Sequence, residues 1–480
     1  MSEDALVNTG AVIWPEHDWA QVTVRRMQAK LHCWAAGDPG RRFDDLYNLV
    51  CDPAFLVVAW QRVAGNVGAR TAGIDRATVA AIVSRFGVEE FLQHVRDQLR
   101  SRTFSPVEVR QVMIPKASGK LRALGIPTVT DRVVQAALKL VLEPIFEADF
   151  APCSYGFRPN RRAQDAIAEI HHFTTKSYHW VVEADIESCF DMIDHVALMD
   201  RVRARIGDKR VLGLVKAFLK AGVMTTTGTR EATHTGTPQG GILSPLLANI
   251  ALSVLDEHFM SKWDQQMASE VCRQRRKRQG KANYRLVRYA DDFVILVTGQ
   301  REHAEQLLNE VADVLAPMGL RLSPEKTRVV HIDHGFDFLG FHIQRMRKRG
   351  SNKWFVYTKP SKKAIASIKS RVKTMTYRAT LHHDPGYLLD YLGRVLRGHG
   401  VSKATFSAID SYTWERITAW LRKKHRIGWP ELRRRFCLPG TWRLAVDGIR
   451  FKGAASVPVI RYRYRGYQIP TPWTPTATTG

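Results

Sequence analysis

Two adjacent aspartates, Asp291 and Asp292, interrupt an otherwise apolar stretch, and this pattern constrains the fold more than any other feature of the chain. Residues 286–289 (LVRY) precede the pair and residues 293–296 (FVIL) follow it. Apolar runs on both sides of a polar turn predict two buried strands with the carboxylates at the hairpin tip. An acidic pair in a turn is often purely structural, so it indicates a functional site only when other residues join it.

A third carboxylate, Asp185, ends another apolar run, residues 180–185 (WVVEAD). Nucleotidyl transfer requires two divalent ions about 4 Å apart, and carboxylates at strand ends supply the hard oxygen ligands that suit Mg²⁺. The three aspartates are therefore compatible with a two-metal site on a buried sheet. The plainer interpretation, a polar turn and an unrelated strand end, stays open at this level.

The distribution of charge favours a polyanionic partner. The 480 residues carry a formal net charge of +26, and residues 341–480 hold 29 basic and 6 acidic side chains, a net of +23. Solubility does not require charge to be concentrated in one region, so nucleic acid is the better explanation. The six cysteines are scattered without zinc-site spacing and are expected to be buried, reduced thiols.

Hydrophobic periodicity predicts a mixed α/β chain that becomes helical and basic beyond residue 340. A basic hairpin tip is expected at residues 117–120 (ASGK), and the Pro/Thr-rich end, residues 471–480, is expected to fray. Helices are expected at 19–63 (two, with a turn at 37–40), 88–100, 129–146, 194–222, 244–263, 303–318, 364–375 and 406–422, and strands at 107–126, 179–185 and 286–296.

Several segments, taken in order, resemble the motif series of reverse transcriptases, specifically those encoded by bacterial group II introns. They are 66–75 (NVGARTAGID), 112–127 (VMIPKASGKLRALGIP), 154–159 (SYGFRP), 183–195 (EADIESCFDMIDH), 236–246 (GTPQGGILSPL), 288–296 (RYADDFVIL), 319–327 (GLRLSPEKT) and 336–341 (FDFLGF). Each segment alone is only suggestive. Their order along nearly the whole chain carries the resemblance.

The resemblance implies an α/β fold arranged as a right-hand polymerase, with fingers and an α+β palm followed by a mainly α-helical, basic thumb or maturase region. The expected domains are a helical N-terminal extension (1–75), fingers and palm (76–345), thumb or maturase (346–450) and a basic, Pro/Thr-rich tail (451–480). The resemblance also implies an enzyme that is encoded by a mobile retroelement, copies intron RNA into DNA and assists the splicing of that RNA. The implied partners are group II intron RNA, an RNA template with a DNA primer, and dNTPs.

The resemblance further implies catalytic and metal-binding roles. Asp185 and Asp291 would bind two Mg²⁺ ions, for which Mn²⁺ can substitute, while the Ile186 carbonyl completes a coordination shell and Asp292 supports the site. Lys326 is similar to the lysine that protonates the leaving pyrophosphate. Surface charge is the alternative for Lys326.

Nucleotide-binding roles are implied for Lys116, Arg122, Phe190 and Gln239. Lys116 and Arg122 flank the basic hairpin tip and would clamp the triphosphate. Phe190 would pack under the sugar and leave no room for a 2′ hydroxyl. Gln239 lies in a glycine turn through which the backbone approaches the template and primer. Solvated charge is the alternative for the two basic residues, and core packing is the alternative for Phe190.

RNA or template contacts are expected at Arg158, Gly240, Arg397, Lys403, Arg422 and Lys423. For Arg158, bracing of the fingers is an equal alternative. Aromatic residues between the basic helices would stack on unpaired bases, although core packing explains them too. They are Trp354, Tyr357, Tyr377, Tyr412, Trp414 and Trp420.

The chain departs from the family pattern in two places. About six residues, two of them aromatic, are expected between Gly398 and His399, and their absence would shorten a thumb helix by more than one turn. The sequence also has no paired cysteines for the zinc-stabilised endonuclease found at the end of many relatives. Without a membrane-spanning run or signal peptide, a cytoplasmic protein is expected, and a homodimer is possible.

Two other functions remain open. One is an RNA-binding splicing cofactor with an idle polymerase, against which the intact Asp185, Asp291 and Asp292 argue. The other is a domesticated bacterial reverse transcriptase that serves defence or diversity generation, against which the match to the thumb argues.

Overall fold

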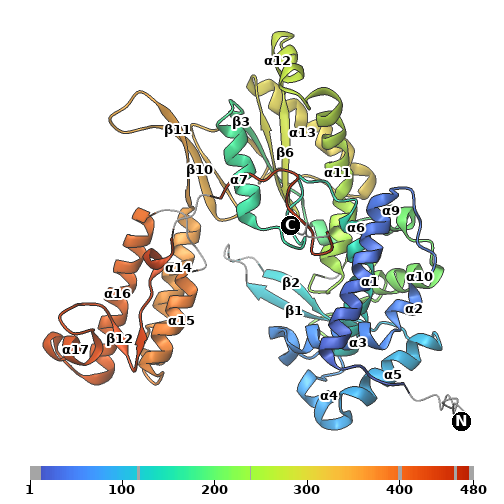
Figure 1. Ribbon diagram of the computed structural model, residues 1–480, viewed down its shortest axis with the longest axis horizontal. Helices are drawn as coiled ribbons and strands as arrows, with labels where there is room; N and C mark the ends of the chain where they lie inside the picture. The colour runs from blue at the N-terminus through green and yellow to red at the C-terminus, as the bar shows by residue number, and fades with distance from the viewer. Residues whose placement is uncertain are drawn as a thin grey trace, which may run out of the picture. The chain divides into compact units, whose positions relative to one another are not determined.

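The computed structural model describes residues 12–115, 119, 121–237, 239–397, 403–458 and 462–474 (Figure 1). They form two compact units. The first comprises the described residues of Met1–Arg162, Val182–Val329 and Arg465–Gly480, and the second those of Ala163–Val181 and Val330–Tyr464. The four-part division expected from the sequence remains a prediction.

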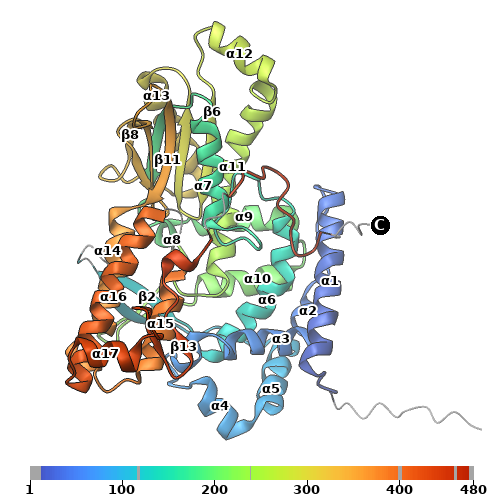
Figure 2. The same ribbon diagram turned by 60° about the vertical axis from the view of Figure 1, so that its left-hand side comes forward.

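Three long helices form the base of the first unit: α1 (His17–Gly37), α3 (Pro53–Ala64) and α6 (Val129–Glu147) pack against one another (Figures 1 and 2). On α1 the buried residues recur at intervals of three and four, which gives one apolar stripe. The side chain of Asp52 accepts the backbone N–H of Ala54 at 2.8 Å and caps α3 at its first turn. The helix expected near 129–146 and the first of the two expected near 19–63 are confirmed, whereas the second is two helices, Tyr47–Val50 and Pro53–Ala64, because Cys51 and Asp52 interrupt it.

Shorter elements complete the first unit around these helices. The predicted helix at 194–222 is two helices, because Gly207 and Asp208 interrupt it and the Asp208 side chain caps the second. The remaining elements are α2 (Tyr47–Val50), η1 (Val67–Arg70), α4 (Val79–Phe86), α5 (Val88–Arg100), α8 (Cys189–Met192), α9 (His195–Arg205), α10 (Lys209–Leu219), α11 (Ser244–Gln266), α12 (Glu270–Arg278), α13 (Arg301–Leu315) and η2 (Ala316–Met318).

A four-stranded sheet of order β6-β7-β3-β8 carries the predicted acidic strand ends. Its strands are β3 (Trp180–Asp185), β6 (Tyr284–Tyr289), β7 (Asp292–Val297) and β8 (Arg328–His331). β6 and β7 are antiparallel and pair Tyr289 with Asp292, so only Ala290 and Asp291 form the turn. Nearly all side chains of this hairpin are buried, and α11 packs against β6 and α13 against β7. The predicted acidic hairpin is confirmed.

A second sheet of the first unit has the order β2-β1-β4-β5. β1 (Val109–Pro115) and β2 (Leu121–Ile126) form an antiparallel hairpin, while β4 (Val223–Met224) and β5 (Arg230–Glu231) extend it. Apart from Gly119, the expected basic tip, including Lys116, lies outside the described residues.

The second unit combines a small sheet with a helical bundle. β9 (Phe336–Phe338), β10 (Phe341–Arg347) and β11 (Trp354–Pro360) form the sheet, and α7 (Ala163–Thr174) contacts β11. Helices α14 (Lys362–Met375), α15 (Pro385–Arg397), α16 (Lys403–His425) and α17 (Trp429–Phe436) enclose one apolar core that includes Val372, Leu392 and Trp420 (Figure 1). The elements η3 (Arg378–Thr380), β12 (Ala445–Val446), β13 (Ile449–Arg450) and η4 (Ala454–Ser456) complete it.

Two expectations about local structure are wrong in part. All six cysteines are free, as predicted, but Cys33 and Cys272 are exposed. The segment 471–474, expected to fray, instead packs on α1: Trp473 is 7% exposed, and its indole N–H donates to the Gln28 side chain at 3.3 Å. Its ring lies 5.6 Å from that of His32. Among the described residues, no helix is long and apolar enough to cross a membrane.

Replacing Trp473 by alanine is expected to lower the free energy of unfolding by about 3 kcal/mol, because a large buried ring is removed. Equilibrium denaturation of the full chain measures this change. Trp19 is the matched control, since it lies on α1 and is 61% exposed. Trp19→Ala should change stability by no more than about 0.5 kcal/mol. Equal losses in the two variants would contradict the packing of the C-terminal segment.

Candidate active site

The turn between β6 and β7 presents Asp291 at its tip. Ala290, the residue before it, has a φ of 58° and is only 6% exposed. A left-handed conformation is unfavourable for alanine, so contacts from neighbouring segments must maintain it. Asp292 is the first residue of β7 and remains accessible to solvent.

Asp185 lies at the end of β3, the strand next to β7 in the sheet. The segment after it pairs with another part of the chain: the Asp185 carbonyl accepts the Ser323 N–H at 2.8 Å, and Ile186 bridges to Leu322. This pairing also brings Lys326 into the site, where its ammonium lies 2.5 Å from Asp185 Oδ2. The structure therefore places Lys326 beside the acidic strand ends, as the resemblance implies.

The carboxylates repel one another. Burial, and then the charge of Asp185, raises the pKa of Asp291, while Arg122 and Lys326 oppose the shift. Desolvation of the carboxylate by the surrounding protein, followed by the charges of Asp291 and Asp185, raises the pKa of Asp292 to about 6. The hydrogen bond to Asp185 raises the pKa of Lys326, which therefore stays protonated. Among the described residues, the three carboxylates carry more negative charge than the Lys326 ammonium neutralises.

The donor set suits a hard divalent cation. Within the described residues, no three His, Cys, Asp or Glu side chains form a ready-made metal cage. Mg²⁺ rarely needs such a cage, because it usually binds through one or two carboxylates together with substrate phosphates and water. Two carboxylates on adjacent strand ends, already attracting an ammonium ion, meet that requirement.

A chain of polar contacts connects the β1–β2 hairpin to the segment after β3. The Arg122 guanidinium donates to Gln239 Oε1 at 2.6 Å, and Gln239 Nε2 donates to Asp191 Oδ2 at 3.0 Å. Gly240 has a φ of 115°, and a Cβ there would lie 2.6 Å from the Gly125 carbonyl oxygen, so only glycine allows this approach. Arg122, Gln239 and Gly240 are thus brought together.

Phe190 is 8% exposed and follows Asp185 within the same segment. Its ring makes an edge contact with Phe157 at a centroid distance of 6.4 Å, and its carbonyl accepts the Thr237 N–H at 2.6 Å. A Cβ at Gly236 would lie 2.5 Å from that carbonyl oxygen. Phe190 is therefore held firmly between the segments 154–159 and 236–246.

Arg158 is a buried bracing residue. Its guanidinium forms an ion pair with Glu147 at 2.7 Å, in which both side chains are nearly inaccessible. It also donates to the carbonyls of Ala151, Ser154 and Phe150. Because the N–H donors of this guanidinium already have acceptors within the protein, they are not available to a template strand. The geometry therefore favours the alternative in which Arg158 braces the fingers.

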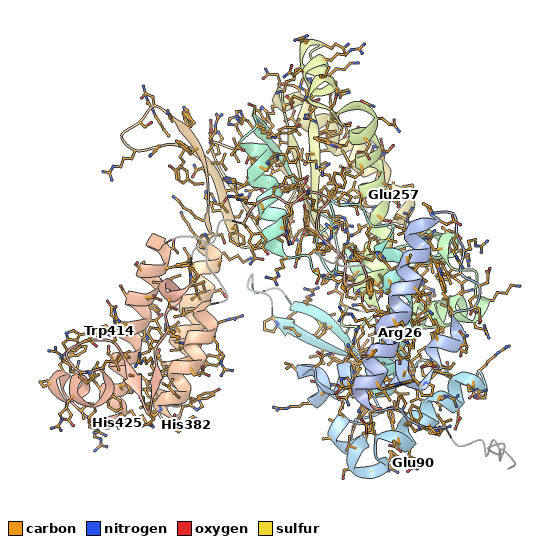
Figure 3. The ribbon with its side chains drawn as sticks, in the orientation of Figure 1. Arg26, Glu90, Glu257, His382, Trp414 and His425 are labelled. Atoms are coloured by element: carbon orange, nitrogen blue, oxygen red, sulfur yellow. The ribbon has the colours of Figure 1, made fainter. Side chains whose placement is uncertain are left out.

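The basic second unit carries a cluster of three tryptophans: Trp414 on α16, Trp429 at the start of α17, and Trp442. Trp414 and Trp429 are stacked with centroids 5.9 Å apart, and Trp442 meets both rings edge-on at 6.1 Å. Trp429 and Trp442 are 41% and 45% exposed. Trp414 is labelled in Figure 3.

Basic side chains surround this tryptophan cluster. The guanidinium of Arg422 lies 4.6 Å from the Trp429 ring and that of Arg433 lies 5.1 Å from the Trp442 ring, while Lys423 is exposed. The sequence predictions did not include Trp429 or Trp442. Core packing is the correct interpretation for Trp420, which is 2% exposed, whereas Trp354 and Tyr377 are more than half exposed. The side chains of Arg397 and Lys403, and the junction after Gly398, lie outside the described residues.

Comparison with known proteins defines the family. A model described as "Reverse transcriptase (RNA-dependent DNA polymerase)" matches residues 114–343, and one described as "Group II intron, maturase-specific domain" matches residues 365–436. Protein YkfC of Escherichia coli is 37% identical over 359 residues, which cover 71% of this chain and 93% of that protein.

Other relatives are longer than this chain. Group II intron-encoded protein LtrA of Lactococcus lactis is 33% identical over 356 residues, 65% of this chain and 58% of LtrA. Nuclear intron maturase 1 of Arabidopsis thaliana is 26% identical over 337 residues, 53% of this chain and 46% of that protein.

The chain belongs to the reverse transcriptases, the RNA-directed DNA polymerases, and is of the group II intron type. Enzymes of this family use divalent metals such as Mg²⁺. The acidic strand ends at Asp185 and Asp291 provide carboxylate oxygens, which are suitable ligands for such an ion.

The raised pKa of Asp292 predicts a pH-dependent destabilisation of the metal-free protein. The folded state holds the proton up to about pH 6 and the unfolded state only up to about 3.8. Stability should therefore fall as pH rises through this interval. Asp292→Asn removes the effect, and above pH 6 it should raise the Tm by on the order of 1–3 °C, allowing for solvent screening.

Thermal unfolding in EDTA at pH 4 and pH 7 tests this difference. The exposed carboxylate of Asp313 on α13 supplies the charge-matched control, Asp313→Asn. If Asp292→Asn raised the Tm equally at both pH values, or by as much as Asp313→Asn does, the raised pKa of Asp292 would not be the cause of the increase.

Proposed function

We propose that this chain copies the RNA of a group II intron into DNA by two-metal nucleotidyl transfer and assists the splicing of that RNA. The observation that carries the polymerase part is the meeting of Asp185, Asp291 and Lys326 at the ends of adjacent buried strands. In this arrangement the sheet with α11 and α13 is the palm, and the β1–β2 hairpin belongs to the fingers. The bundle of α14–α17 is the thumb.

Asp185, Asp291 and the Ile186 carbonyl would hold two Mg²⁺ ions, with Asp292 supporting them through its charge. The metals would activate the primer 3′ hydroxyl and stabilise the triphosphate. Lys326 is now hydrogen-bonded to Asp185, and this bond stabilises its protonated form. An ammonium that gives up its bond to Asp185 would keep this proton and could donate it to the departing pyrophosphate.

The dNTP would lie between the palm and the β1–β2 hairpin. Arg122 and Lys116 would bind its phosphates, and the Arg122–Gln239 hydrogen bond brings the guanidinium toward the carboxylates, as its influence on the pKa of Asp291 supports. Phe190 would lie under the sugar. Its fixed position between two loops suits a residue that rejects a 2′ hydroxyl by steric exclusion.

The second unit would bind the intron RNA. The tryptophan cluster offers exposed ring surface, and Arg422 and Lys423 provide charge beside it. Ring surface suits stacking with unpaired bases, and the basic side chains suit phosphate contacts. Arg397 and Lys403 of the same unit would also contact this RNA, whereas Gly240 of the first unit would contact the RNA template.

The polymerase proposal predicts primer extension on poly(rA)/oligo(dT) with Mg²⁺. Asp291→Ala should reduce the rate by at least about 10³-fold, because removal of one metal ligand eliminates several kcal/mol of transition-state stabilisation. Asp313→Ala, which removes an exposed carboxylate, should leave the rate unchanged. An inactive wild-type protein that still binds intron RNA would instead support the splicing cofactor with an idle polymerase.

The RNA-binding proposal predicts that Trp429→Ala combined with Trp442→Ala weakens binding of intron RNA by about 10-fold to 100-fold, since one base stacked on the cluster contributes about 1–3 kcal/mol. Filter binding or fluorescence anisotropy measures the change. The loss should persist at high salt, whereas Lys423→Gln should instead reduce the salt dependence of binding. Tyr387→Ala is the control for an exposed aromatic side chain in the same unit. An equal loss of RNA affinity in this control would contradict a specific role of the tryptophan cluster in RNA binding.

A further inference from the structure

The turn formed by Ala290 and Asp291 is the catalytic turn of the proposed function. Arg288 lies directly beneath it and is completely buried together with Asp256 of α11, both at 0% side-chain exposure. Its Nε donates to Asp256 Oδ1 at 2.8 Å and its Nη2 to Oδ2 at 2.5 Å. This parallel pairing of a guanidinium with a carboxylate fixes both the position and the plane of the arginine.

The other donors of Arg288 are all used as well. Nη1 donates to the Asn249 side chain at 3.0 Å and to the Ala290 carbonyl at 2.8 Å, while Nη2 also donates to Ser154 Oγ at 2.8 Å. A guanidinium has five N–H donors in a planar fork, and each one here has an acceptor. A lysine ammonium, with three donors at a single point, cannot reproduce this set.

One of these acceptors belongs to the catalytic turn. Ala290 immediately precedes Asp291 and adopts the left-handed conformation that alanine disfavours. The hydrogen bond from Arg288 to its carbonyl fixes the orientation of the peptide between Ala290 and Asp291. The direction in which the Asp291 carboxylate leaves the turn depends on that peptide.

The loop 153–156 supports the turn from its other side. Arg288 and this loop exchange backbone hydrogen bonds, since the Arg288 N–H donates to the Cys153 carbonyl at 2.9 Å and the Tyr155 N–H donates to the Arg288 carbonyl at 2.8 Å. Asn249 also donates to the Gly156 carbonyl at 2.9 Å. At Gly156, a Cβ would overlap the backbone nitrogen of Ala290. The loop therefore touches the turn so closely that only glycine fits.

We infer that Arg288 is a positioning residue that sets the orientation of the Asp291 carboxylate by tying the Ala290 carbonyl to Asp256, Asn249 and Ser154. A buried ion pair is not needed for stability alone, because apolar residues of similar volume often serve equally well. A planar donor with five directed bonds is needed to hold three segments and one strained peptide in a single geometry. The inference rests on the proposed catalytic role of Asp291.

Arg288→Lys is the first test, because it retains the charge opposite Asp256 and removes the planar fork. We expect kcat for dNTP incorporation to fall about 100-fold, the effect of a displacement on the order of 1 Å at a reacting group. KM for dNTP should change by less than about threefold, since the nucleotide contacts are intact. Ser154→Ala deletes a single acceptor and should show a smaller fall in kcat with little loss of stability.

Arg205→Lys is the matched control. Arg205 is also buried in the first unit, lies 3.0 Å from Asp149 and donates to the carbonyls of Ala35 and Asp38, but none of these partners belongs to the catalytic turn. It should lower the Tm as Arg288→Lys does and leave kcat within about threefold of the wild type. Equal losses of kcat in the two lysine variants would overturn the inference, because general destabilisation would explain both.

Hydrogen exchange in the metal-free protein provides a readout that is independent of activity. In Arg288→Lys the amides of residues 289–292 should exchange at least about 10-fold faster, while those of α3 and α6 keep the rates of the wild type. Unchanged exchange at 289–292, or an equal rise throughout the unit, would contradict the inference. If the wild type incorporates no dNTP, the proposed polymerase function fails, and the exchange result still decides whether Arg288 holds the turn.

Discussion

The buried ion pair between Arg288 and Asp256 is the interaction on which the architecture of the site depends. It joins α11 to β6 with no solvent access, and the remaining donors of Arg288 extend the connection to the Ala290 carbonyl and to Ser154. A half-satisfied charged network in a protein interior is unfavourable, so folding favours the arrangement in which all five bonds are made. The rigidity of the turn at Ala290 and Asp291 follows from this requirement.

At the protein surface, the carboxylates of the same site carry negative charge that the neighbouring described side chains do not fully neutralise. Asp185 and Asp291 converge on adjacent strand ends. Burial, and then the charge of Asp185, raises the pKa of Asp291, while Lys326 offsets only part of the charge. Charges held close by a rigid base cannot separate to relieve their repulsion. Because the free energy of folding has already brought these carboxylates together, their arrangement is preorganised for binding a cation.

The outline of the site could be predicted from the sequence because its carboxylates end apolar runs that are local and easily recognised. Arg288 was not recognised, since it lies within such a run and its partners are far along the chain, Asp256 at 32 residues and Ser154 at 134. Trp473 was missed for the same reason: its Pro/Thr-rich segment resembles a frayed end, and the contact with Gln28 spans 445 residues. For Arg158, bracing and template contact were equal alternatives, and only the buried partner Glu147 separates them.

The protein itself, before any metal binds, is expected to set the geometry of the Asp185 and Asp291 carboxylates. Two crystal structures of the enzyme, one without divalent ions and one with Mg²⁺, primer–template and an unreactive dNTP, test this expectation. We expect the same turn in both, with Ala290 left-handed and its carbonyl on Arg288, and with Lys326 released from Asp185 only when Mg²⁺ is present. A turn that reaches this conformation only in the Mg²⁺ complex would contradict it.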